Sequence, residues 1–135
     1  MATTGSKANW FENVALDLFL GNQAYTVPTG IFIGLFTSAL DDTSTTGEGE
    51  IFQRFSAAAD LENWTTADAG SKNNAVAFEW PTATANMGTA EYFGIMESGA
   101  GAGRIMYWGQ LATGKIIGSG DVFRFPSGTI AVTED

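Results

Sequence analysis

The chain has 135 residues, of which 44% are hydrophobic and 13% are aromatic, enough for one domain with a hydrophobic core. It carries 6 Lys and Arg residues against 15 Asp and Glu residues, and it contains no histidine and no cysteine. These two absences exclude disulfides, thiolate chemistry, the usual zinc sites and every nucleophile that histidine activates. We therefore expect a single domain spanning residues 1–135, with no cofactor and no enzymatic activity.

The net charge of −9 argues against partners that carry phosphate groups. The basic residues are spread along the chain, whereas a nucleic-acid surface needs clustered Lys and Arg. No apolar run is long enough to span a bilayer, and the first residues lack the order of a signal peptide. We expect synthesis in the cytoplasm, with neither a nucleic-acid nor a membrane partner.

The first twenty residues predict a tail followed by a helix. Residues 1–8 are interpreted as a flexible N-terminal tail, and residues 9–20 as a helix. Asn9 and Glu12 match a variant of the capping box, and Gly21 stands where a helix ends. Apolar residues follow the spacing of one helical face. Because so short a helix is marginal alone, this face must dock on the domain's own sheet or on a neighbouring subunit.

From residue 30 onward the pattern is typical of β-structure. Short apolar stretches alternate with clusters of Gly, Asn, Asp, Ser and Thr. We predict a mainly β fold, an antiparallel β-sandwich or jelly roll over residues 30–133, preceded by the one helix. Strands are expected near residues 30–37, 51–56, 75–80, 91–97, 104–110, 115–117, 122–125 and 129–133. Residues 40–50 are interpreted as a mobile acidic loop.

Two patterns look like nucleotide or metal sites. Residues 109–115 match the G-x-x-x-x-G-K part of a P-loop, but Ile116 supplies no hydroxyl for magnesium and no helix follows, so a hairpin turn is favoured. The acidic residues Asp41, Asp42, Glu48 and Glu50 are candidate calcium ligands. Their spacing does not match an EF-hand, which favours a solvated loop and leaves calcium binding open.

Three glutamates on apolar strands are candidates for carboxylate catalysis. These are Glu79, Glu91 and Glu97. Catalysis would require one of them to lie in an apolar pocket that raises its pKa, whereas strand alternation points all three outward. We therefore predict no catalytic residue.

The aromatic residues suggest an interface. Tyr107 and Trp108 are adjacent, so a strand places them on opposite faces, and at least one should meet water, a sugar or another subunit. Together with the apolar face of the helix, they complete the set of predicted interaction residues. That set is Trp10, Phe11, Val14, Leu18, Tyr107 and Trp108.

Six segments spread along the chain carry a family resemblance. They are NWFEN at residues 9–13, YTVPT at 25–29, IFIGLFTS at 31–38, FGI at 93–95, YWGQL at 107–111 and GSGD at 118–121. Together they resemble small structural proteins of tailed-bacteriophage virions, a family often labelled tail fibre proteins. In size and type these proteins are similar to head cement or decoration proteins. The resemblance covers residues 9 to about 133, with the segments 40–50 and 61–74 peculiar to this chain, and it transfers no binding residue.

The resemblance implies a virion protein that acts by binding. The leading hypothesis is a capsid cement or decoration protein, a homotrimer seated between capsomers of the major capsid protein on the outer surface of the head. The alternative is a tail fibre or baseplate module that contacts tail proteins or a host surface glycan. An enzyme acting on the cell envelope is a third and more distant possibility. The number of copies per virion separates the first two.

Overall fold

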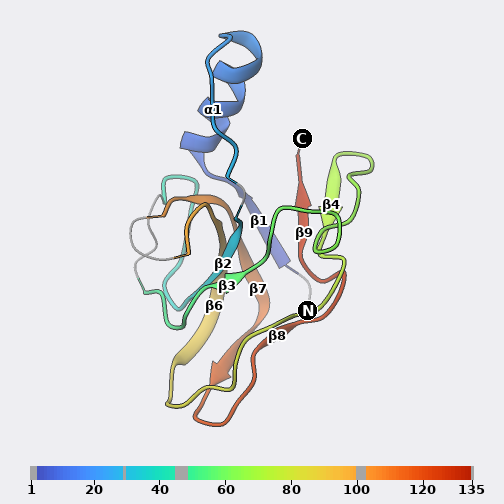
Figure 1. Cartoon of the computed structure of the whole chain (residues 1–135). Helices are drawn as coiled ribbons and strands as arrows, with labels where there is room; N and C mark the ends of the chain where they lie inside the picture. Colours follow the sequence, from blue (N-terminus) through green and yellow to red (C-terminus); the bar gives the residue numbers. More distant parts are fainter. Residues whose placement is uncertain (1–2, 29, 45–48, 100–102, 135) are drawn as a thin grey trace.

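The computed structural model describes residues 3–28, 30–44, 49–99 and 103–134, with the backbone alone described for residues 3–5. The described chain is mainly β with one helix near its N-terminus (Figure 1). In chain order the elements are β1 (Thr3–Lys7), α1 (Asn9–Leu20), β2 (Phe32–Phe36), β3 (Phe55–Ser56), β4 (Ser71–Asn73), β5 (Phe78–Glu79), β6 (Gly88–Met96), β7 (Ile105–Ile117), β8 (Arg124–Phe125) and β9 (Ala131–Thr133).

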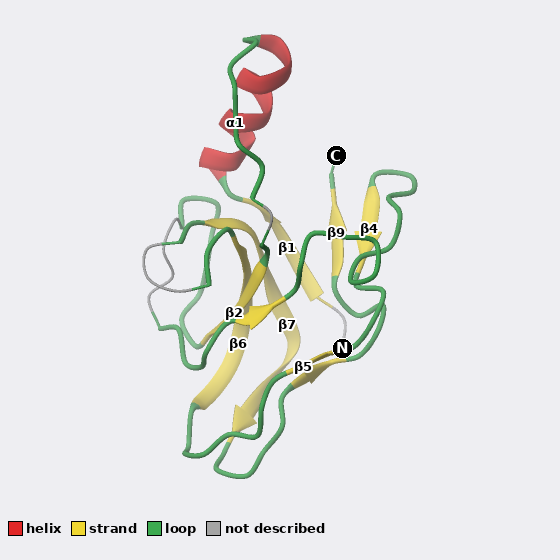
Figure 2. Ribbon diagram, in the orientation of Figure 1, coloured by secondary structure: helices red, strands yellow, loops and turns green. Residues whose placement is uncertain are grey.

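Five strands form one antiparallel sheet in the order β1-β7-β6-β2-β3. Two short antiparallel ladders, β4–β9 and β5–β8, form a second layer (Figure 2). Side chains of the second ladder share the main core with side chains of the large sheet, and the Phe93 and Phe125 rings lie 5.5 Å apart. The prediction of a mainly β, antiparallel fold with one N-terminal helix is confirmed.

The large sheet has an apolar cluster on each face. Ile33 and Leu35 of β2 point into the main core, whereas Phe36 belongs to a second cluster with Leu40 and Met96. Alternate residues of a strand face opposite sides, so the second cluster lies on the other face of the sheet. Leu40 belongs to the segment that the sequence predicts as a mobile acidic loop, and it is buried there. The start of that loop therefore covers the second face.

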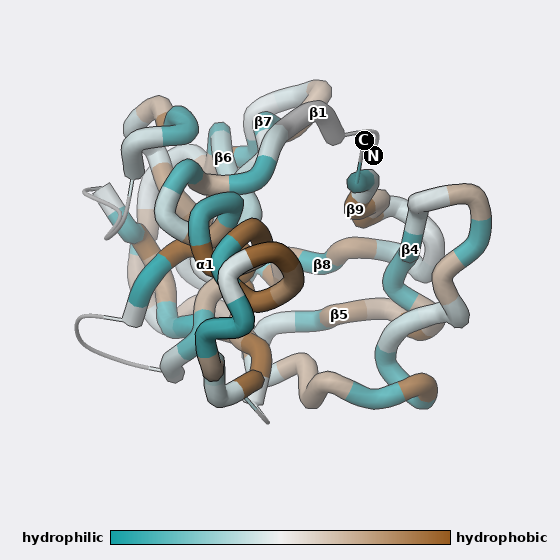
Figure 3. Tube along the Cα trace, turned by 90° about the horizontal axis from the view of Figure 1, so that it is seen from above, coloured by the Kyte–Doolittle hydropathy of each residue, from teal (hydrophilic) through white to brown (hydrophobic). Residues whose placement is uncertain are grey.

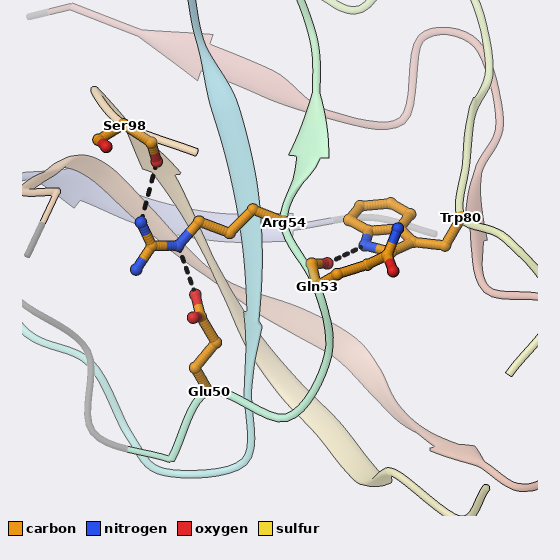
Figure 4. A network of polar contacts seen from close by, with 5 residues as sticks. All are labelled: Glu50, Gln53, Arg54, Trp80 and Ser98. Carbon is orange, nitrogen blue, oxygen red and sulfur yellow. Dashed lines mark hydrogen bonds and ion pairs between the residues drawn. The ribbon is translucent and has the colours of Figure 1, made fainter. Parts of the chain in front are cut away.

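Polar contacts tie the segment around β3 to its neighbours (Figure 4). The Arg54 guanidinium donates to the Glu50 carboxylate at 2.9 Å and to the Ser98 carbonyl oxygen at 2.9 Å. One residue earlier, the Gln53 carbonyl accepts the indole N–H of Trp80 at 2.8 Å. Trp80 is fully buried against the rings of phenylalanines in the main core. This segment is therefore bound both to the core and to the end of β6.

The strands differ from the sequence prediction in three places. Residues 3–7 form β1, where the sequence predicts a flexible tail, because they pair with residues 107–111 of β7. Residues 71–73 form β4, where no strand is predicted, because they pair with β9. The two strands predicted at 104–110 and 115–117 are one strand, β7, so the hairpin turn predicted at 109–115 is wrong. In each case a distant partner strand determines the conformation.

Candidate interaction surface

The first turn of α1 is anchored to the body of the protein. The Ala8 N–H donates to the Met106 carbonyl at 2.9 Å, and the Asn9 N–H donates to the Asp42 carbonyl at 2.8 Å. The N-cap residue is Ala8, with no side-chain cap, so the predicted capping role of Asn9 is wrong. Beyond this turn the helix projects away from the sheets (Figure 1), and none of its residues is buried.

Aromatic and charged side chains surround the base of the helix. The Phe11 and Tyr107 ring centroids lie 5.4 Å apart, and the Lys7 ammonium lies 5.4 Å from the Phe11 centroid. The same ammonium pairs with the Glu134 carboxylate at 2.7 Å, which also accepts the Tyr107 hydroxyl at 2.6 Å. These contacts join β1, α1, β7 and the residue that follows β9. The helix base is therefore held by segments from both ends of the chain.

Two titratable groups in this cluster have shifted pKa values. Burial raises the pKa of the Tyr107 hydroxyl above its ordinary value of 10.0, and the neighbouring Glu134 carboxylate adds to the rise. Burial also favours the protonated form of Glu134. The hydrogen bonds from Lys7 and Tyr107 outweigh that effect, and the pKa of Glu134 is lowered from 4.5. The neutral tyrosine paired with a carboxylate is thus the stable state at neutral pH.

Trp10 anchors the other side of the helix base. Its indole N–H donates to the Ile105 carbonyl at 2.6 Å, and the Arg104 guanidinium carbon lies 3.7 Å from its ring centroid. Arg104 in turn donates to both Glu97 carboxylate oxygens, at 2.8 and 3.3 Å. Burial raises the pKa of the nearby Tyr25 hydroxyl, with a further contribution from Glu97. Glu97, one of the three candidate catalytic glutamates, is thus engaged in an ion pair.

The other acidic candidates have separate partners or positions. Glu79 is exposed and faces Arg124 in the β5–β8 register, and Glu91 is half-buried on β6. Asp42 accepts the Trp108 indole N–H at 2.9 Å, and Glu50 pairs with an arginine. Among the described residues no group of three or more acidic side chains is placed to hold a metal ion. Glu48 lies outside the described residues.

An apolar groove of about 780 Å³ opens between α1 and the segment 59–72. From the large sheet Ile95, Met106 and Tyr107 line it, and from β9 it is lined by Val132. Seen from above in Figure 3, hydrophobic stretches alternate with hydrophilic ones along the helix. Phe11, Val14, Ala15, Leu18 and Phe19 are the helix residues that line it. A groove of this kind is suited to receive apolar side chains of a partner.

The structure brings four of the six predicted interaction residues to this groove. Phe11, Val14, Leu18 and Tyr107 line it. Trp10 lies at the helix base, stacked on a guanidinium, whereas Trp108 lies on the opposite face of the sheet against Tyr92. All six are half-buried, and their role in binding stays a prediction.

The opposite wall of the groove is not among the predicted residues. It comes from the segment 59–72, which includes the exposed Leu61 and the buried Trp64. A signal was present in the sequence, because Leu61 is an isolated large apolar residue among Ala, Asp, Glu and Asn. Periodicity does not detect such a residue, since the segment before β4 is an irregular loop.

A comparison with protein families matches residues 6–133 to a family described as podophage GP4 fiber I protein gp80. The chain belongs to this fibre family. The resemblance to phage virion structural proteins is thereby confirmed, and this fibre-family member is a virion component. A search of curated proteins found no match. None of the helices in the described part of the chain has the length and apolar character needed to cross a membrane.

Proposed function

We propose that this protein is a module of the phage tail fibre apparatus that works by protein–protein contact. The observation that carries the proposal is the apolar groove beside a projecting helix, in a member of a fibre family. Monomeric proteins rarely leave large apolar surfaces uncovered, and such surfaces mark binding sites. The partner expected at the groove is another protein of the virion tail.

The fibre family supports this tail location at least as well as the head location that the sequence analysis placed first. A head cement protein would use the same kind of surface against the major capsid protein. The two functions differ in stoichiometry, because a cement protein occupies sites over the whole head. The head location is therefore the competing outcome of the test.

A host glycan is a less favoured partner for the groove. Sugar recognition uses aromatic rings together with polar groups that pair with hydroxyls. The surface of the groove is instead mostly apolar, and its large exposed side chains are Leu61, 66% exposed, Val27, 68% exposed, and Phe19, 80% exposed. Trp108, one of the two aromatic residues expected from the sequence to meet water, a sugar or another subunit, already donates its indole N–H to Asp42. These features favour a protein partner over a sugar.

Quantitative mass spectrometry of purified virions tests the proposal. The copy number of this protein is measured against the major capsid protein, and labelled antibody on whole particles locates it by electron microscopy. We expect a small number of copies per particle and labelling at the tail. A copy number comparable with that of the major capsid protein, with labelling over the head, would overturn the tail proposal in favour of head cement.

A further inference from the structure

We propose that Glu134 is a latch that sets the width of the apolar groove, by holding one wall of the groove against the base of helix α1. That wall belongs to a small lobe made of residues 58–76 and 126–134, which includes the β4–β9 ladder. The other wall consists of α1 and the large sheet. The inference concerns the regulation of the groove, and it rests on the binding role proposed above for that groove.

Apolar packing anchors the lobe at the main core. Trp64 and Ile130 are buried there, and the ring centroids of Trp64 and Phe78 lie 5.3 Å apart. Burial then falls along β9, because Ile130 is fully buried, Val132 is half-buried and Glu134 is exposed. The lobe is therefore held firmly at one end by apolar contacts, and its packing becomes looser toward the end of β9.

The polar contacts of the lobe with its surroundings all involve one residue. In the described chain, every hydrogen bond and ion pair between the lobe and the other segments passes through the Glu134 carboxylate, which pairs with the Lys7 ammonium at 2.7 Å and accepts the Tyr107 hydroxyl at 2.6 Å. The other hydrogen bonds of the lobe are internal. One of them joins the Glu134 N–H to the Gly70 carbonyl at 2.8 Å, which fixes Glu134 to the lobe.

The partners of Glu134 belong to the base of the helix. The Lys7 ammonium lies 5.4 Å from the Phe11 ring centroid, and the Phe11 and Tyr107 centroids lie 5.4 Å apart. All of these residues line the groove. Figure 1 shows β9 running toward the end of the molecule from which α1 projects. The latch therefore holds the end of the lobe that lies away from its apolar anchor, and its release would let the two walls separate.

The strength of the latch depends on the charge of Glu134. Burial opposes the charged form, yet the hydrogen bonds from Lys7 and Tyr107 outweigh this effect, and the pKa of Glu134 is lowered from 4.5. The latch is therefore complete at neutral pH and weakens as the pH falls below about 4.5. In the described chain no other titratable group that lines the groove has a hydrogen bond or ion pair with Glu134. These other groups are Tyr25, Asp60 and Lys72.

Spin labels on the two walls measure the width of the groove. Because the chain contains no cysteine, Asn13→Cys on the helix and Leu61→Cys on the lobe, both at exposed positions, carry the only labels. Labelled protein is diluted with unlabelled protein, so that pulsed electron resonance records distances within one copy. We expect one narrow distance at pH 7. Glu134→Ala should add a longer distance and raise the ratio of open to closed molecules about fivefold, since a partly exposed ion pair and one hydrogen bond are lost.

Two controls separate the latch from other motions. Glu62→Ala removes an exposed acid of the same lobe whose carboxylate has no hydrogen bond or ion pair in the described chain, and it should leave the distance unchanged. Labels at Asn13→Cys and Ile116→Cys join the helix to the large sheet, and Glu134→Ala should not alter that distance. An unchanged distance between the groove walls in Glu134→Ala would overturn the inference. Equal changes in Glu62→Ala, or in the helix-to-sheet pair, would also contradict it.

Acidification tests the latch without a substitution at Glu134. Lowering the pH to about 3.5, with circular dichroism to show that the domain stays folded, should produce the same longer distance. Glu134→Gln should show part of this opening at pH 7 and change less on acidification. A folded protein whose wall distance is the same at both pH values would contradict the latch. The distances are recorded without a partner, so the latch and the function proposed from the virion measurements can fail separately.

Discussion

Replacing Trp10 by Phe tests how the projecting helix is held. The indole N–H donates to the Ile105 carbonyl at 2.6 Å, and the ring stacks on the Arg104 guanidinium at 3.7 Å. Phenylalanine keeps much of the apolar contact but has no donor. Loss of the hydrogen bond costs about 1 kcal/mol, and the weaker cation–π contact costs about 0.5 kcal/mol more. We expect Trp10→Phe to lower the free energy of unfolding by about 1.5 kcal/mol.

Urea unfolding and hydrogen exchange of the α1 amides measure this effect. Both are carried out at the same low protein concentration for every variant, so that contacts between copies do not contribute. Trp80→Phe is the matched control, since it removes the indole bond to the Gln53 carbonyl at 2.8 Å away from the helix. It should destabilise the domain without faster local exchange in α1. A cost below about 0.5 kcal/mol for Trp10→Phe, with unchanged α1 exchange, would refute the anchor.

Four further substitutions test the cluster, the core and the groove. Tyr107→Phe removes the hydroxyl that donates to Glu134. Because the raised pKa of Tyr107 contributes stability that is lost as the pH rises, urea titrations should show a smaller loss of stability above pH 10 in the variant than in the wild type. Glu134→Gln should lessen the loss of stability below about pH 4.5, measured by melting temperature, because a lowered pKa contributes stability that is lost as the pH falls. Asn74→Ala should lower the free energy of unfolding, measured by calorimetry, by about 3 kcal/mol, since the fully buried amide accepts from one backbone N–H and donates to two carbonyls. A cost below about 1 kcal/mol would contradict this. Leu18→Ala should cost less than about 2 kcal/mol in the isolated protein and more in assembled virions, and equal costs would contradict a covered groove.

Local patterns in the sequence predicted the fold where local interactions determine it. The helix lies at residues 9–20 as predicted, because its apolar spacing and terminal glycine are contained within the segment. β1 escaped prediction, since Thr-Thr-Gly-Ser-Lys has no apolar alternation and becomes a strand by pairing with β7. The glycines of β7 suggested a turn, yet Gly109 pairs with β6 on one side and with β1 on the other, and the ladder with β6 resumes at Lys115 after an irregularity. Strand pairing of this kind is not encoded in any short window.

The candidate interaction surface was predicted only in part, because part of it depends on contacts between distant segments. Strand alternation placed Tyr107 and Trp108 on opposite faces, and the structure has them in different clusters. A bulge in β7, between the positions paired with Ile95 and Met96, turns Met106 toward the same core as Tyr107. That irregularity and the wall from residues 59–72 depend on tertiary contacts. The sequence therefore revealed one side of the groove and not the other.

The net charge of −9 explains why apolar surface has to supply the binding energy. Three of the six cations are used inside the subunit, in the ion pairs Lys7–Glu134, Arg54–Glu50 and Arg104–Glu97. The surplus acids make copies repel one another at distances within the screening length, about 8 Å at physiological salt. Burial of apolar area, at about 25 cal/mol per Å², acts at contact and offsets this repulsion. Added salt screens the repulsion and leaves the apolar contact in place. Any association of copies through apolar surface should therefore strengthen with salt, opposite in sign to the salt dependence of a protein that binds nucleic acid.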